Sequence, residues 1–141
     1  MKHIFMDTNV VIDFLANRQP FSLDAARLFN MSVEGKIKIY ISAVSYNNIY
    51  YVLRQSLTNN ATIKLLENLA DMTEITDVTG KVVQQSLKTD FKDYEDAIQY
   101  YSALSIPNVD FIVTRNAKDF KKSSLPVLTS AEAVVLLNIE L

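Results

Sequence analysis

The sequence predicts a single α/β domain over residues 1–141, built on a mostly parallel sheet. The first observation is that short apolar runs alternate with longer segments whose apolar residues recur at helical spacing, as in a parallel sheet covered by helices. The second is that only two glycines and three prolines occur in 141 residues, which leaves little room for linkers. A chain of this length can bury one full core.

The first three expected elements are a strand and two helices. Residues 4–6 are apolar and end at a polar side chain, which is typical of a buried strand. Thr8 or Asn9 is placed to cap the helix that follows, and Ser22 is placed to cap the next one. Gly35 is expected to end this second helix, because glycine readily takes the left-handed conformation found there.

The middle of the chain continues the alternation. Residues 36–42 alternate apolar and polar side chains with period two, the clearest strand pattern in the sequence. Helical spacing of apolar residues predicts helices over residues 45–55 and 63–69. A weak strand at 73–78 and a short helix at 79–88 follow.

The last third repeats the pattern with a helix, two strands and a final helix. The helix is expected over residues 93–104, and the strands over 110–114 and 126–128. Thr129 and Glu132 have the spacing of a capping box, which opens a final helix through residue 137.

Composition excludes several kinds of site. Cysteine is absent, so there is no disulfide framework or thiol chemistry, and His3 is the single histidine. No apolar run reaches the length of about 20 residues that a membrane span needs. We therefore expect a cytoplasmic protein with no membrane contact. The formal charge is −2, so nucleic acid would have to be held by a local patch or through metal ions.

Acidic side chains follow strands or open helices at places that a parallel sheet brings together. Asp7 follows the first strand, Thr114 closes a later one, and Asp96 begins a helix within a group of three acids. Ligand sites of open α/β sheets form at the carboxyl ends of the strands. Neighbouring carboxylates suit a divalent cation such as Mg²⁺, which can activate water against a phosphodiester. Helix caps and solvated helix starts are the structural alternative for the same residues.

Four segments resemble the PIN domain family in order and spacing: residues 6–10 (MDTNV), 41–45 (ISAVS), 93–99 (DYEDAIQ) and 114–120 (TRNAKDF). Within that family the chain is similar to the bacterial single-domain branch that contains VapC-type toxins. The resemblance implies a three-layer α/β/α sandwich and Mg²⁺- or Mn²⁺-dependent endoribonuclease activity. It also implies RNA as substrate, an antitoxin protein as partner and homodimer formation.

The resemblance also assigns site residues. Asp7 matches the first metal-binding aspartate and Asp96 the aspartate at the start of the later helix, with Asp93 as an auxiliary acid. Thr114 matches the residue that closes the late strand. Asn116 and Asp119 both fall where the family places its last polar group, and Asn116 is preferred because it is nearer the strand end.

The sequence departs from the family at Asn48, which stands where a glutamate is expected. An amide oxygen can bind a cation but adds no negative charge, so metal affinity should fall. Asp93 or Asp13 would make up some of the lost charge if its side chain reaches the site, and Glu95 is expected to point away. Two functions stay open: an active nuclease, or an RNA- or protein-binding module that has lost turnover.

Arg115, the nearby lysines and a group of tyrosines each have both a structural and a functional interpretation. Arg115 is placed either for phosphate contact or for a surface role, and the lysines near it form either a solvated turn or an RNA contact. The tyrosines of the 45–55 helix favour core or dimer packing over base stacking. A receiver-type phosphotransfer domain and a Rossmann-type nucleotide binder fit less well, since the required lysine and the glycine-rich loop are absent. The basic run comprises Lys118, Lys121 and Lys122, and the tyrosines are Tyr46, Tyr50 and Tyr51.

Overall fold

The structure is a computed structural model that describes residues 1–140 and contains a five-stranded sheet with strand order β3-β2-β1-β4-β5. Every neighbouring pair of strands is parallel, which confirms the α/β fold class and makes the sheet fully parallel. Each strand is followed by a helical connection, as parallel pairing requires. The strands are β1 (Lys2–Met6), β2 (Ile37–Ser42), β3 (Glu74–Thr76), β4 (Phe111–Val113) and β5 (Val127–Leu128).

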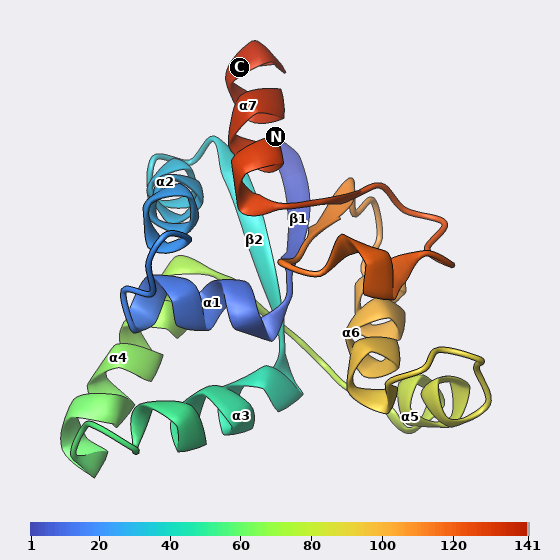
Figure 1. Cartoon of the computed structure of the whole chain (residues 1–141), viewed down its shortest axis with the longest axis horizontal. Coiled ribbons are helices and arrows are strands. Elements are labelled where there is room, and N and C mark those ends of the chain that lie inside the picture. Colours follow the sequence, from blue (N-terminus) through green and yellow to red (C-terminus); the bar gives the residue numbers. More distant parts are fainter. Residues whose placement is uncertain (141) are drawn as a thin grey trace.

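Helices cover both faces of the sheet (Figure 1). One face carries α1, α2, α3, α4 and α7, and the other carries α6 with α5 packed beside it. Within residues 1–140 the helices are α1 (Thr8–Leu15), α2 (Ser22–Val33), α3 (Ala43–Leu53), α4 (Asn59–Met72), α5 (Gly80–Leu87), α6 (Tyr94–Leu104), the 3₁₀ helix η1 (Ala117–Phe120) and α7 (Ser130–Glu140).

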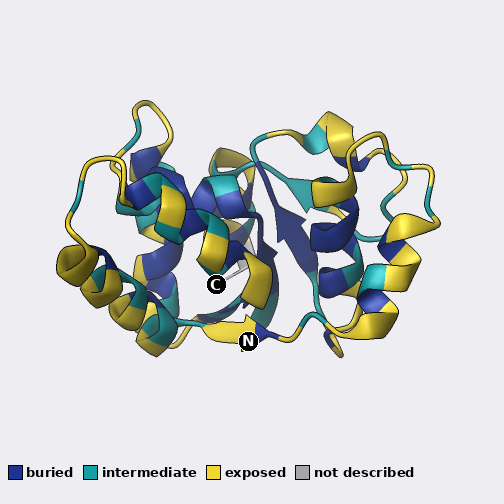
Figure 2. Cartoon of the chain, turned by 90° about the horizontal axis from the view of Figure 1, so that it is seen from below, coloured by how far each residue is buried: buried dark blue, intermediate teal, exposed yellow. Residues whose placement is uncertain are grey.

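Side chains of the central strands alternate between two cores. Ile4 and Met6 point into the larger core with the apolar faces of α1 and α2, whereas Phe5 points into a smaller core beneath α6. This alternation is the two-residue period of a strand that is buried on both sides. Figure 2 shows the buried strands enclosed by helices whose outer surfaces are exposed. Among the described residues, no helix has the length and apolar character needed to cross a bilayer.

Helix ends follow the expected residues with three corrections. Gly35 has a φ of +76°, and Thr129 and Glu132 form the reciprocal capping box: each backbone N–H donates to the other side chain. The first correction is that Asp7, not Thr8 or Asn9, caps α1. In the second, Phe21 occupies the N-cap position of α2 and Ser22 is its first helical residue.

The third correction concerns the two elements nearest the candidate site. Helix α3 begins at Ala43, two residues earlier than expected, so Ser42 both ends β2 and occupies the N-cap position of the helix. The polar turn after β4 contains η1, which the spacing of apolar residues did not indicate. Both differences shorten the connection between a strand end and the following helix, which fixes the backbone at the carboxyl edge of the sheet.

Helix α3 uses its tyrosines in different ways. Tyr46 packs against the larger core, and the Tyr50 hydroxyl donates to Asn59 Oδ1 over 2.6 Å. The Tyr51 side chain is 64% exposed. Core packing is therefore confirmed for Tyr46, while dimer packing by the exposed Tyr51 stays a prediction.

Candidate functional site

Asp7 lies at the junction of β1 and α1 with both carboxylate oxygens held. Its Oδ1 accepts from the Thr8 backbone N–H, and its Oδ2 accepts from the Thr114 hydroxyl, each over 2.8 Å. Thr114 reaches it because β1 and β4 are adjacent and parallel. Burial raises the pKa of Asp7, and these two hydrogen bonds oppose the shift. A carboxylate offers about four lone pairs, so each oxygen can still bind a cation.

Replacing Thr114 by valine tests this arrangement. The change keeps the shape of a fully buried side chain but leaves Asp7 Oδ2 without its donor, and the Asn116 N–H loses its acceptor. We expect Thr114→Val to lower the free energy of unfolding by about 1–3 kcal/mol, measured by urea denaturation. Thr114→Ser keeps the hydroxyl and should lose about 1 kcal/mol or less. Equal losses for both variants would assign the effect to the methyl group.

The first turn of α6 brings two further acids toward Asp7. Asp93 is the N-cap, and its Oδ1 accepts from the Glu95 N–H over 2.8 Å. Burial, together with the negative charges of Asp7, Asp93 and Asp119, raises the pKa of Asp96 to about 6. The repulsion shows that Asp96 and Asp7 lie in one region although 89 positions separate them (96 − 7).

Glu95 does not point away, which corrects the expectation from the sequence. Its Oε1 accepts from Gln99 Nε2 at 3.5 Å, and burial and the negative charge of Asp7 raise its pKa to about 7. Gln99 is fully buried, and its Nε2 also approaches Thr8 Oγ1 at 3.2 Å and Ser45 Oγ at 3.0 Å. This amide joins the starts of α1 and α3 to α6. The sequence did not indicate this role, because glutamine in a helix is ordinarily a surface residue.

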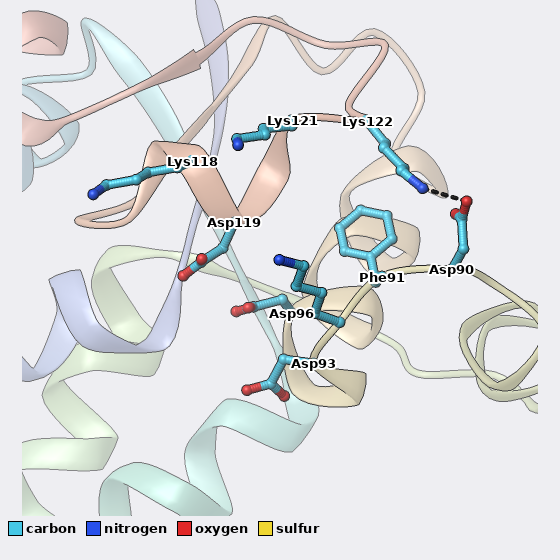
Figure 3. A pocket seen from close by; sticks show the side chains of 9 residues that line it. Asp90, Phe91, Asp93, Asp96, Lys118, Asp119, Lys121 and Lys122 are labelled. Carbon is cyan, nitrogen blue, oxygen red and sulfur yellow. Dashed lines mark hydrogen bonds and ion pairs between the residues drawn. The ribbon is translucent and has the colours of Figure 1, made fainter.

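A pocket of about 380 Å³ opens beside Asp96. Figure 3 shows Asp93, Asp96 and Asp119 on one side of it, with Lys118 and Lys121 nearby. Lys122 extends away from these acids to pair with Asp90, and Phe91 and Lys92 complete the lining.

The β4–η1 loop offers the pocket Asp119 and not Asn116. Asp119 also contributes to the raised pKa values of Asp7 and Asp96. The 3₁₀ turn at residues 117–120 explains the difference, since it brings position 119 back to the acids. The geometry therefore favours the alternative that the sequence ranked second, and metal binding by either residue stays a prediction.

Asp13 does not line this pocket, because it forms a buried ion pair elsewhere. Its Oδ2 lies 3.0 Å from Arg115 Nε, and its side chain is 1% exposed. The Arg115 guanidinium also lies 4.4 Å from the ring centroid of Phe21. The ion pair of Asp13 thus joins α1 to the β4–η1 loop, and Asp13 does not supply charge beside Asp96. Phosphate contact by Arg115 stays a prediction, and it would have to use the partly exposed end of the guanidinium.

Asn48 is half-buried on α3, one helical turn after Ser45. Ser45 is fully buried, and its hydroxyl lies 2.7 Å from Oγ1 of Thr8, the residue that follows Asp7. Residues three apart in a helix share a face. Asn48 therefore projects from the side of α3 that is joined to α1 and α6.

The donor set fits a hard divalent cation. Asp7, Asp96 and their neighbours offer oxygen atoms, and burial together with the negative charge of neighbouring acids raises the pKa of both aspartates. Among residues 1–140, however, no three Asp, Glu, His or Cys side chains already converge as a metal cage. An ion that keeps several waters and uses few carboxylates, as Mg²⁺ does, suits this open arrangement.

Comparison with known families assigns the chain to one family. A family model described as PIN domain matches residues 3–118, which is most of the chain. The chain belongs to the PIN domain family. No curated protein gives a significant match to the sequence.

Solved structures similar to this PIN domain include a VapC toxin and several VapBC complexes. A toxin–antitoxin complex from Klebsiella pneumoniae is 22% identical, with a TM-score of 0.65 over 90% of this chain and 97% of that one. DNA-bound VapBC from Salmonella typhimurium is 18% identical, with a TM-score of 0.68 over 92% and 99%. VapC20 from Mycobacterium tuberculosis, a sarcin–ricin loop cleaving toxin, is 14% identical, with a TM-score of 0.60 over 77% and 86%. At these identities the likeness concerns the fold.

Proposed function

We propose that this PIN domain is a metal-dependent endoribonuclease that hydrolyses RNA phosphodiester bonds. The observation that carries the proposal is the meeting of Asp7 and Asp96 at the carboxyl edge of the sheet, beside a pocket with a lysine-bearing rim. PIN domains typically bind Mg²⁺ or Mn²⁺. Uncompensated carboxylates hold such a cation, and the lysines suit a polyanionic substrate.

Each residue has a part in this proposal. Asp7 and Asp96 hold the cation, and Thr114 fixes the carboxylate of Asp7 in orientation. Asp93 and Asp119 add negative charge from the pocket wall, and Asn48 contributes an amide oxygen from α3. A bound divalent cation supplies an activated water and stabilises charge on the phosphate.

The lysine rim is proposed to position the RNA backbone. Lys118 and Lys121 lie near the acids, whereas Lys122 is occupied by Asp90 (Figure 3). Phosphate groups next to the scissile bond would pair with Lys118 and Lys121. Contacts of this kind hold a backbone without reading its sequence.

The decisive experiment is cleavage of labelled single-stranded and structured RNA with Mn²⁺ or Mg²⁺. We expect cleavage by the wild type, none after chelation, and loss to background for the double variant Asp7→Asn/Asp96→Asn. Asp71→Asn changes an exposed acid on α4 in the same chemical way and should cleave normally. Cleavage that persists in the double variant would remove these two residues from the mechanism.

We further propose that the protein is the toxin component of a toxin–antitoxin pair, acts in the cytoplasm and forms homodimers. Its support is the likeness to solved toxin–antitoxin complexes, some of them bound to DNA. A short reading frame next to the gene, whose product co-purifies with this chain and blocks cleavage, would be expected. A neighbour that binds without affecting cleavage would contradict the antitoxin role.

A second candidate is a binding module without turnover, which Asn48 favours because it adds no charge where the resemblance expects a carboxylate. The same assay separates the two. Cleavage that appears only in Asn48→Glu identifies a site that has lost activity, whereas cleavage by the wild type identifies the enzyme.

A further inference from the structure

Glu95 is exposed at the start of α6, and a buried amide donates to its carboxylate. Gln99 lies one turn further along α6, on the same face of the helix, and its Nε2 is 3.5 Å from Glu95 Oε1. An exposed glutamate at a helix start would ordinarily extend into water. Here its carboxylate has a donor on the protein side, so it turns toward the sheet edge.

The orientation of the Gln99 amide follows from its neighbours. Its Nε2 faces the hydroxyl oxygens of Thr8 and Ser45 as well as Glu95. The reverse orientation would place the amide oxygen against the carboxylate of Glu95, which is repulsive. The amide oxygen is buried and has no hydrogen-bond partner within the described residues. A buried polar atom without a hydrogen-bond partner lowers stability. The contacts of the NH₂ group with Thr8, Ser45 and Glu95 must therefore stabilise this orientation of the amide.

The contacts of Gln99 define where Glu95 lies. Thr8 follows Asp7 directly, and Ser45 precedes Asn48 by one turn of α3. Glu95 is one turn before Gln99 on α6. The starts of α1, α3 and α6 thus meet at the Gln99 amide. Glu95 and Asn48 are each one helical turn from that meeting point, and Asp7 is next to it.

We propose that Glu95, oriented by Gln99, is the third carboxylate of the metal site formed by Asp7 and Asp96, and that it supplies from α6 the negative charge that Asn48 does not supply from α3. The inference rests on the proposed metal-dependent function. It changes the ligand set assigned from the sequence, in which Glu95 had no part. Gln99 is a positioning residue, since it holds Glu95 in place and is not itself a ligand of the ion.

The test measures Mn²⁺ affinity of the intact protein by electron paramagnetic resonance of the free ion, without reference to RNA cleavage. Gln99→Met keeps the volume of the buried side chain but removes the donor, and it should weaken Mn²⁺ binding by about 10- to 100-fold. Glu95→Gln should weaken it at least as much. Glu67→Gln, at an exposed position on α4, is the matched control and should bind as the wild type does.

The distinguishing variant is Glu95→Gln combined with Asn48→Glu. Because both positions face the same meeting point, we expect the new carboxylate on α3 to restore most of the affinity lost from α6. Unchanged affinity in Glu95→Gln, together with a loss in Asp96→Asn, would overturn the role of Glu95 and leave the proposed function standing. A wild type that binds no Mn²⁺ would overturn both.

Discussion

Asp96→Asn is expected to reduce RNA cleavage strongly while making the metal-free protein more stable at neutral pH. Loss of one charged group in the reaction centre should reduce cleavage by about 10²- to 10³-fold, on the scale seen for removal of one stabilising group in other active sites. Stability should change in the opposite direction. Asp96 is repelled by Asp7, Asp93 and Asp119, and asparagine removes that repulsion.

The sign of the pH dependence follows from the raised pKa of Asp96. Its pKa moves from an ordinary value of 3.8 to about 6 in the folded protein, so the folded state holds the proton more tightly. Its contribution to stability is present below about pH 4 and is lost as pH rises through about 6. The asparagine variant has no such loss. It should exceed the wild type by about 1 kcal/mol at pH 7.5, after allowance for solvent screening, and match it near pH 4.

Urea denaturation with a chelator present, at pH 4 and pH 7.5, measures this difference. Asp71→Asn is the control, since its exposed carboxylate lies on α4, away from these acids. Addition of Mn²⁺ at pH 7.5 should stabilise the wild type and not Asp96→Asn, because only a site that binds the ion gains from it. A variant that is less stable than the wild type at pH 7.5 would show that Asp96 has a favourable partner in the folded state.

Arg115→Met is expected to give the largest loss of stability among these variants. Asp13 is 1% exposed, and the Arg115 guanidinium is its ion-pair partner at 3.0 Å. Removal of one partner of a buried pair leaves an uncompensated charge, which costs about 3–5 kcal/mol. The partial exposure of Arg115 and the positive charge of Arg18 place the expected loss near the lower end, about 3 kcal/mol. Differential scanning calorimetry should show a midpoint lowered by about 10 °C.

The double variant Asp13→Asn/Arg115→Met separates charge from packing. With no carboxylate left unpaired, it should recover most of the loss, to within about 1 kcal/mol of the wild type. No recovery would mean that stacking of the guanidinium on Phe21 is the larger contribution. Mn²⁺ affinity of the single variant is a useful companion measurement, because Arg115 anchors the loop that carries Asp119.

The order of elements was predictable because it depends on local patterns. Alternation along residues 36–42, the Gly35 stop and the Thr129–Glu132 capping box act within a few residues, and the structure has all three. The fold class followed from the same patterns, and the sheet is parallel throughout. The likeness of Asp7 and Asp96 to the PIN motif located two acids that the structure brings to one edge.

The partners of those acids depend on contacts between distant segments, which no local pattern encodes. The sequence places Asn116 nearer the strand end than Asp119, but the 3₁₀ turn decides that Asp119 lines the pocket. Asp13 and Arg115 are 102 positions apart (115 − 13), and their pairing requires α1 to pack beside the β4–η1 loop. Glu95 turns inward because Gln99 is buried between Thr8 and Ser45.

The sequence by itself therefore determined an α/β chain whose acids collect where parallel strands end, since strand and helix periods and the directions of parallel strands fix that edge. Only the tertiary structure decided which carboxylates are free to act. An ion pair commits the buried Asp13 to Arg115, and a hydrogen bond from Gln99 turns Glu95 toward Asp7. The physical reason is that the free energy of a charged group depends on its solvent exposure and its neighbours, which only packing sets.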